Sequence, residues 1–196
     1  MAKILMMKNL VKTLTLFLLL STLLGCGRIL NTQIADTLPP CVGKYSAETW
    51  SNCYGSVSLL AENEFKGDKY IGEWKNGKFN GRGTYYYLAE NKSKGDKYVG
   101  EWKNGEMFGL GTYYFLANNE FKGNIYFGEH NNGKPNGQGT YTFGPQSKFA
   151  GDKYIGEVKE GRPHGQGTYQ FSNGKKYVGD FKNGLTIGIG TLTFEG

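Results

Sequence analysis

The feature that most constrains this chain is a spacing of glycines that recurs five times along its 196 residues. Segments of the form Tyr-x-Gly-(Glu/Asp)-x-x-x-Gly-x-x-x-Gly-x-Gly-Thr begin at Tyr70, Tyr98, Tyr126, Tyr154 and Tyr177, at intervals of 28, 28, 28 and 23 residues. Five glycine columns account for 25 of the 31 glycines. A fixed period of this length predicts an array of similar supersecondary units, each of which buries its apolar face against its neighbours.

Each repeat predicts a β-hairpin. Tyr70, Gly72 and Trp74 alternate onto one face of a strand. Asn76-Gly77 follows, and this dipeptide favours the two-residue hairpin turns in which both central residues have positive φ. Hairpins in series predict an all-β fold: a single elongated, twisted antiparallel meander that is stable because neighbouring hairpins pack together.

The turn also predicts a register between the two strands of the hairpin. A turn centred on the Asn-Gly pair sets Gly72 opposite Gly81 and Tyr70 opposite Gly83. Aromatic rings would then lie flat over the glycine backbone of the next strand, which explains why glycine is tolerated in strands that it otherwise weakens. Aromatic residues make up 15% of the chain, so its glycine content indicates packed strands and not a flexible linker.

The pattern Tyr-x-Gly-Glu-Trp-x-x-Gly-x-x-x-Gly-x-Gly resembles the MORN (membrane occupation and recognition nexus) repeat. The resemblance covers residues 65–196 and extends more weakly through a degenerate first repeat at 41–69, in which Cys41 to Tyr45 and Cys53 to Gly55 stand for the two strands. His130 and Val158 replace the tryptophan of this pattern in the repeats that begin at Tyr126 and Tyr154. The resemblance implies a non-catalytic array that organises other proteins near membranes, with phospholipid as a proposed ligand.

The first 25 residues have the pattern of an export signal. Three lysines and no acid precede an apolar stretch from Leu14 to Leu24, which is too short to span a bilayer. We therefore expect a helical signal peptide over residues 1–25. Without its three lysines the chain keeps 20 basic against 17 acidic residues, a balance too even to indicate nucleic-acid binding.

Leu23-Leu24-Gly25-Cys26 resembles the lipobox of bacterial lipoproteins. The resemblance implies cleavage before Cys26 and two or three acyl chains, palmitate among them, on that residue, enough for stable anchoring. Gly27 in place of an aspartate implies the outer membrane, with the protein in the cell envelope on the periplasmic side if the cell is Gram-negative. The alternative is a conventional signal peptide cut elsewhere. Residues 26–40 would tether the lipid to a sheet domain at 41–196.

Cys41 and Cys53 are the two thiols that remain if Cys26 is lipidated. A lone pair of thiols in an exported protein predicts a disulfide. The alignment places the pair on one face of the degenerate first hairpin as diagonal neighbours, where a bridge would stabilise a terminal repeat that lacks one neighbour.

The sequence predicts no catalytic site, no cofactor and no metal site. Catalytic carboxylates occur as one matched pair in a pocket, whereas here an acid recurs once per repeat, so we interpret these acids as structural hydrogen-bond acceptors. They are Glu73, Glu101, Glu129, Glu157 and Asp180. His130 occupies an aromatic column and is interpreted as a core ring, and His164 lies at a variable position. The Gly-Asp pairs are interpreted as ordinary turns, at Asp68, Asp96 and Asp152.

One aromatic stripe is the candidate binding face. Its members are Tyr70, Trp74, Tyr98, Trp102, Tyr126, Tyr154, Tyr177 and Phe181. Either these side chains pack on one another and on the glycines, or part of the stripe stays exposed as a groove for an apolar or extended partner. We expect a substantial exposed groove, because no helix or second sheet is predicted to cover it.

The predicted function is a membrane-anchored, non-catalytic binding or scaffold lipoprotein with an unknown protein or phospholipid partner. The alternatives are a self-assembling structural protein of the envelope and an accessory subunit of an envelope enzyme. The last strand, Thr191 to Phe194, would have an unpaired edge that allows a homodimer.

Overall fold

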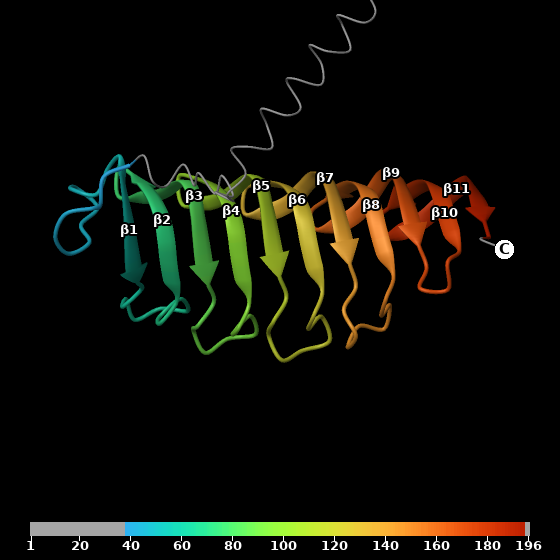
Figure 1. Cartoon of the computed structure of the whole chain (residues 1–196), viewed down its shortest axis with the longest axis horizontal. Helices are drawn as coiled ribbons and strands as arrows, with labels where there is room; N and C mark the ends of the chain where they lie inside the picture. The colour runs from blue at the N-terminus through green and yellow to red at the C-terminus, as the bar shows by residue number, and fades with distance from the viewer. Residues whose placement is uncertain (1–37, 195–196) are drawn as a thin grey trace, which may run out of the picture. The chain divides into compact units, whose positions relative to one another are not determined.

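Eleven antiparallel strands follow one another in chain order to form a single open sheet in the computed structural model, which describes residues 38–194 (Figure 1). The predicted all-β meander is confirmed, and the expected signal helix lies outside the described residues. The bounds are Cys53–Ser58 (β1), Lys69–Lys75 (β2), Lys78–Tyr86 (β3), Lys97–Lys103 (β4), Glu106–Tyr114 (β5), Ile125–Asn131 (β6), Lys134–Thr142 (β7), Lys153–Lys159 (β8), Arg162–Gln170 (β9), Lys176–Lys182 (β10) and Leu185–Thr193 (β11).

The predicted two-residue turn joins β2 to β3. Asn76 and Gly77 have φ of 50° and 66°, so both central residues adopt the positive φ that this turn requires. The Gly77 N–H donates a hydrogen bond to the carbonyl of Trp50, and the turn glycine of each later repeat donates in the same way to the unit before it. The turns therefore stack, and each one helps to fix the next.

The predicted register is wrong beyond a bulge in each hairpin. Trp74 pairs with Phe79 as the turn demands, but Gly72 pairs with Gly83 and Tyr70 with Tyr85, a shift of two residues. The same shift recurs in the other four repeats. Bulges bend the strand that carries the extra residues, and in Figure 1 the hairpin ends of the strands turn away from the viewer along the upper edge of the sheet.

Gly81 causes the shift. Its φ of 76° takes β3 out of the extended conformation, and the side chain of Glu73 occupies the space where a Cβ on Gly81 would lie. A residue with a side chain would be strained here and would also collide with the glutamate. The bulge thus depends on a contact between the two strands, which a pattern of periodicity in one strand does not reveal.

The N-terminal edge of the sheet is closed by a loop instead of the expected first strand of a hairpin. Residues 41–52 form turns and bends, and Trp50 packs edge-on against Trp74 with 5.1 Å between ring centroids. The disulfide between Cys41 and Cys53 is present, as predicted, and holds this loop against β1. Within the expected strand Gly43 has a φ of 73°, which takes the backbone out of the extended conformation.

Candidate functional site

The candidate aromatic stripe lies on one face of the sheet, where its side chains form the core. Seven of the eight are buried and Tyr177 is half-buried; Tyr70, Tyr98, Tyr126 and Tyr154 are 0% exposed. The expected exposed groove is therefore wrong for these residues. The physical reason is that the bent strands and the glycines let each ring lie directly on backbone, so the sheet covers its own aromatic side chains without a second layer.

Tyr98 shows how one such ring is held. Its hydroxyl donates a hydrogen bond of 3.1 Å to the carbonyl of Glu101 in the same strand. Its ring lies against Gly100 and Gly111, where added Cβ atoms would collide with the phenol. Tyr70, Tyr126 and Tyr154 repeat this hydrogen bond three residues along their own strands. The polar end of each ring is thus satisfied inside the sheet.

Each of the four fully buried tyrosines is covered by the following repeat. The ring of Trp102 lies edge-on to Tyr70 at 5.4 Å between centroids, and Phe181 does the same to Tyr154 at 5.0 Å. His130 takes this place over Tyr98 at 4.9 Å, which agrees with its interpretation as a core ring. The stripe is therefore a chain of contacts between repeats.

Burial changes the ionisation of these rings. Loss of contact with water raises the pKa of Tyr154 to about 12 and raises the pKa values of Tyr98 and Tyr126 further. The same burial lowers the pKa of His130 to about 4. All four rings are consequently neutral near pH 7 and contribute packing and hydrogen bonds, not acid–base chemistry.

The aspartates that were interpreted as turn residues have a larger role than the sequence indicated. Asp68 is 0% exposed and accepts hydrogen bonds of 2.6 and 2.7 Å from the backbone N–H groups of Leu88 and Ala89, and one of 2.7 Å from the hydroxyl of Tyr85. The equivalent side chains, which all follow the glycine three residues before each repeat tyrosine, make corresponding bonds. They are Asp96, Asn124 and Asp152.

These side chains join the start of one repeat to the loop after its hairpin. The sequence does carry a signal for this role, because an acid or amide recurs at the same position before the first strand of four repeats. An acceptor that recurs at a fixed position indicates a structural hydrogen bond better than a solvent-exposed turn, because buried N–H groups need partners.

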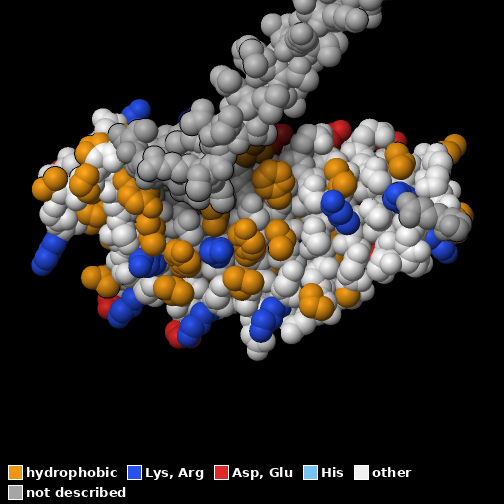
Figure 2. All heavy atoms as spheres, viewed as in Figure 1, with side chains coloured by type: hydrophobic (Ala, Val, Ile, Leu, Met, Phe, Trp, Pro, Cys, Tyr) orange, Lys and Arg blue, Asp and Glu red, His pale blue; other side chains and the backbone are white. Residues whose placement is uncertain are grey.

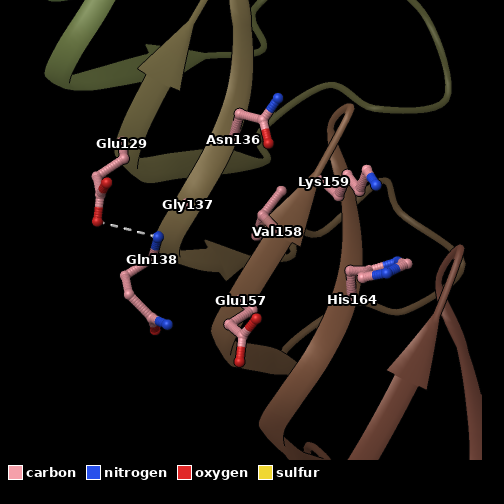
Figure 3. Close-up of a pocket in the computed structure, with 8 residues that line it drawn as sticks. All are labelled: Glu129, Asn136, Gly137, Gln138, Glu157, Val158, Lys159 and His164. Atoms are coloured by element: carbon pink, nitrogen blue, oxygen red, sulfur yellow. Dashed lines mark hydrogen bonds between the residues drawn. The ribbon is translucent and has the colours of Figure 1, made fainter.

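Four acids of the glutamate column, Glu101, Glu129, Glu157 and Asp180, accept hydrogen bonds, as predicted. Among the described residues Oε1 of Glu73 is buried without a hydrogen-bond partner. Glu129 Oε1 lies 3.1 Å from the backbone nitrogen of Gln138 (Figure 3). Glu157 Oε1 lies 3.3 Å from the backbone nitrogen of Gln166. Both N–H groups belong to the bulged strand beside the glutamate. The carboxylates therefore stabilise the bulge that they help to cause.

A cleft of about 370 Å³ between the third and fourth repeats contains two of these glutamates, Lys159 and His164. Figure 3 shows the His164 ring directed away from both carboxylates. A general acid–base pair needs its members within reach of one reacting group, and this arrangement does not supply one. Among residues 38–194 there is also no group of three or more side chains that could hold a metal ion.

The opposite face, which we call the outer face, carries three parallel rows that cross the strands. The apolar row alternates aliphatic or aromatic residues with threonine. Its members are Ile71, Thr84, Val99, Thr112, Phe127, Thr140, Ile155, Thr168, Val178 and Thr191. Phe127 is 54% exposed and Ile155 46%. This row was not singled out from the sequence, although its alternation with the buried stripe was visible there.

The basic row and the acidic row lie on either side of the apolar row. The basic row contains Lys69, Tyr86, Lys97, Tyr114, Ile125, Thr142, Lys153, Gln170 and Lys176. The acidic row contains Glu73, Glu101, Glu129, Glu157 and Asp180, each paired across to its neighbouring strand. In Figure 2 hydrophobic and basic side chains intermingle over the strands, and acidic side chains are visible along the upper edge and beside basic ones at the lower left.

The predicted lipid anchor is not addressed by the described residues. Cys26, the expected lipidation site, lies outside them. Within residues 38–194, no helix is long and apolar enough to cross a bilayer.

Comparison with known proteins bears on the repeats. A sequence model of the MORN repeat matches residues 70–87, 98–115, 126–148, 154–176 and 177–195, together about half of the chain. No curated protein matches the chain significantly. The matched segments coincide with the five hairpins whose turns, bulges and tyrosines are described above. The chain belongs to the MORN repeat family.

Proposed function

We propose that this protein is a non-catalytic binding scaffold, held at a membrane by acyl chains on Cys26, and that it binds a protein partner on the outer face of its sheet. The resemblance of Leu23-Leu24-Gly25-Cys26 to a lipobox supports the anchor. MORN repeats are consistent with a binding or scaffold role. The exposure of side chains supports the outer face as the contact surface.

The observation that carries the proposal is the exposed apolar row. Sheets with one solvated face normally present polar side chains there. Here Phe127, Ile155 and Val178 are 54%, 46% and 47% exposed and lie in one line across the strands. An apolar row between charged margins is typical of a surface for interaction, since it can be desolvated while the margins fix the orientation.

The charges favour a protein over a lipid surface. The basic row alone suits anionic headgroups, but the acidic row runs parallel to it on the same face, and its exposed members Glu101, Glu129 and Glu157 would be repelled by such headgroups. A protein ridge with opposite charges on its two sides would match all three rows.

The test compares two double variants of the full chain as bait in detergent extracts of the membrane fraction. Phe127→Ser with Ile155→Ser removes the centre of the apolar row. Leu88→Ser with Leu116→Ser is the matched control, because these loop side chains are 48% and 46% exposed but lie outside the three rows. We expect the first pair to lose a partner that the control retains, with both variants as thermally stable as the parent.

Equal capture by both variants would refute the outer face as the binding surface. Vesicles provide a second arm. If Cys26→Ala protein binds vesicles of anionic phospholipid, and Phe127→Ser with Ile155→Ser abolishes that binding, the same face is assigned to lipid instead of protein.

A further inference from the structure

The buried core of the sheet consists of two clusters of apolar side chains, one on each side of the joint between β5 and β6. The N-terminal cluster extends as far as Tyr98 and Trp102 on β4. The C-terminal cluster begins with Tyr126 on β6. Tyr113 on β5 is half-buried and packs against both clusters. The two strands lie side by side in the middle of the sheet (Figure 1), so this joint divides the array into one block of β1–β5 and one of β6–β11.

His130 on β6 is the buried ring that connects the two blocks. Its centroid lies 4.9 Å from that of Tyr98 and 5.2 Å from that of Tyr126, edge-on to both. Among residues 38–194, no other contact between two aromatic rings crosses the joint of β5 with β6. In the two preceding repeats the equivalent ring is a tryptophan, Trp74 or Trp102. The contact between the blocks therefore depends on a ring that can take up a proton in mild acid.

The neutral form of His130 fits this place, and the protonated form does not. Nδ1 lies 3.1 Å from the carbonyl oxygen of Gly128, and since a carbonyl only accepts, Nδ1 carries the hydrogen. Nε2 is buried and has no hydrogen-bond partner among the described residues. By contrast, the Nε1–H of Trp102 donates to the carbonyl of Gly83 on β3. Protonation of His130 would bury a positive charge and a donor without an acceptor, and burial accordingly lowers the pKa of the ring to about 4.

The side chains around His130 do not compensate a charge on its ring. Tyr98 on β4 and Tyr126 on β6 flank the ring, and burial raises the pKa values of their hydroxyls, which stay neutral. The residues opposite His130 in the adjacent strands are Gly109 on β5 and Pro135 on β7, which have no titratable group.

The carboxylates near the joint are engaged elsewhere. Glu101 on β4 and Glu129 on β6 belong to the acidic row of the outer face, and each accepts a backbone N–H of the bulged strand beside it. Asp96 accepts the hydroxyl of Tyr113 and two backbone N–H groups of the following loop. None of these three carboxylates contacts the His130 ring, so a proton on that ring has no counter-charge in the core.

The third repeat has a second departure from its neighbours, at Asn124. Asp96, at the equivalent position, accepts three hydrogen bonds, whereas the side chain of Asn124 accepts one, from the N–H of Gly144. The hydroxyl of Tyr141, freed from this position, donates to the carbonyl of Gly161. The stability of a repeat array is the sum of its units and of the contacts between them, so an array opens first where both are weak.

We propose that the joint between β5 and β6 is an acid-sensitive hinge. When His130 takes up a proton, β6 separates from β5 and the ring reaches water, while the blocks β1–β5 and β6–β11 each stay folded. Thr112 and Phe127 are paired across this joint, so opening divides the apolar row of the outer face between them. The opening itself does not depend on the lipid anchor or on binding at the outer face.

The experiment measures hydrogen–deuterium exchange of the full chain in detergent at pH 8 and pH 5, read by mass spectrometry of peptides. Protection factors remove the intrinsic pH dependence of exchange, and solvent-exposed carboxylates are still mostly ionised at pH 5. If the pKa of His130 rises from about 4 to 6.5 on opening, the ratio of open to closed forms increases about 30-fold between these two conditions. We expect protection in β5 and β6 to fall by about this factor, and protection in β2, β3, β9 and β10 to stay unchanged.

Two variants of His130 and one of the other histidine complete the test. His130→Phe should abolish the loss of protection at pH 5, and His130→Trp, which restores the ring of the two preceding repeats, should do the same. His164→Gln removes the only other histidine and should keep the loss. An equal loss of protection in every strand would overturn the hinge, because the sheet would then unfold as one unit. A parent chain without the loss, or a loss that persists in the His130 variants, would also overturn it.

Discussion

The hydroxyl of Tyr113 donates a hydrogen bond of 2.8 Å to Oδ2 of Asp96, seventeen residues earlier in the chain. The other oxygen of the same carboxylate accepts 2.7 Å hydrogen bonds from the backbone N–H groups of Leu116 and Ala117. Asp96 is 5% exposed. One buried carboxylate thus ties the start of β4 to the end of β5 and to the loop that follows, and it is part of what makes neighbouring hairpins a single unit.

Asp96→Ala should lower the free energy of unfolding by about 3 kcal/mol, because it leaves up to three buried donors without an acceptor. Asp96→Asn should cost about 1 kcal/mol, since an amide oxygen can still accept from the loop backbone. Asn124 already does so at the equivalent position, where its Oδ1 accepts the N–H of Gly144 at 2.8 Å. Urea unfolding followed by circular dichroism would measure both changes. Equal losses for the two variants would contradict this role for Oδ1.

His130 should make stability depend on pH. It is 2% exposed, and burial lowers its pKa from 6.5 to about 4. The unfolded chain therefore binds a proton more readily than the folded chain between these two values, so stability falls as the pH falls from about 6.5 towards 4. When the pH has fallen through this range, His130 has lowered the free energy of unfolding by about 3 kcal/mol.

The carboxylates also titrate in this range, so the measurement is a difference between two proteins. His130→Phe places an uncharged ring in the column where Phe181 already lies. Denaturant unfolding at several pH values should show a gap between variant and parent that is constant above pH 7 and that widens by about 3 kcal/mol towards pH 4 in favour of phenylalanine. A gap that does not change with pH would show that His130 keeps its ordinary pKa.

Gly111→Ala should destabilise the sheet by steric conflict. An added Cβ would collide with the hydroxyl and ring of Tyr98, which have little room to move because that side chain is 0% exposed. Overpacking of this kind costs about 3 kcal/mol. The control is Gly105→Ala, where nothing lies within 4 Å of an added Cβ and only the positive φ of 93° opposes alanine, at about 1 kcal/mol. The melting temperature of Gly111→Ala should be well below that of Gly105→Ala. The reverse order would mean that the Tyr98 ring moves aside to accommodate the added methyl group.

The repeats were predictable because their signals are local and strong. Alternation at Tyr70, Gly72 and Trp74 gives the strand faces, and the Asn76-Gly77 pair gives the turn. The shift of register at Gly81 was not predictable in this way. It depends on the side chain of Glu73 from the neighbouring strand, which fills the space above that glycine. Period and turn type specify where strands lie in the chain, but not a contact made across them.

The aromatic side chains of the candidate binding face do lie on one face of the sheet, but the exposed groove expected there is wrong because they are buried. The sequence offers no second layer to cover Tyr98, and a flat sheet would leave it exposed. The bend and the glycine backbone cover it instead, and they leave Phe127 and Ile155 on the other face in contact with water. The N-terminal cap was missed for a related reason, because Trp50 lies in a stretch without any period.

The disulfide between Cys41 and Cys53 should contribute about 3 kcal/mol, since it closes a short loop in the unfolded chain. Replacing both cysteines with alanine should lower the free energy of unfolding by that amount, and adding reductant to the parent should have the same effect. Thiol alkylation of the native protein followed by mass mapping checks the bridge itself. Two residues that alkylate without reductant would show that it is absent.

Cys26→Ala tests the proposed anchor. Two or three acyl chains hold a protein on a bilayer far more firmly than one, because each buried methylene contributes about 0.8 kcal/mol. The parent should therefore partition into the detergent phase, and the variant should remain unprocessed or move to the aqueous phase. Cys41→Ala with Cys53→Ala is the matched control, since it removes cysteines without touching the lipobox. A Cys26→Ala protein that is processed and fractionates like the parent would rule out a lipoprotein. The outer face would then bind its partner without the higher local concentration that anchoring to a membrane provides.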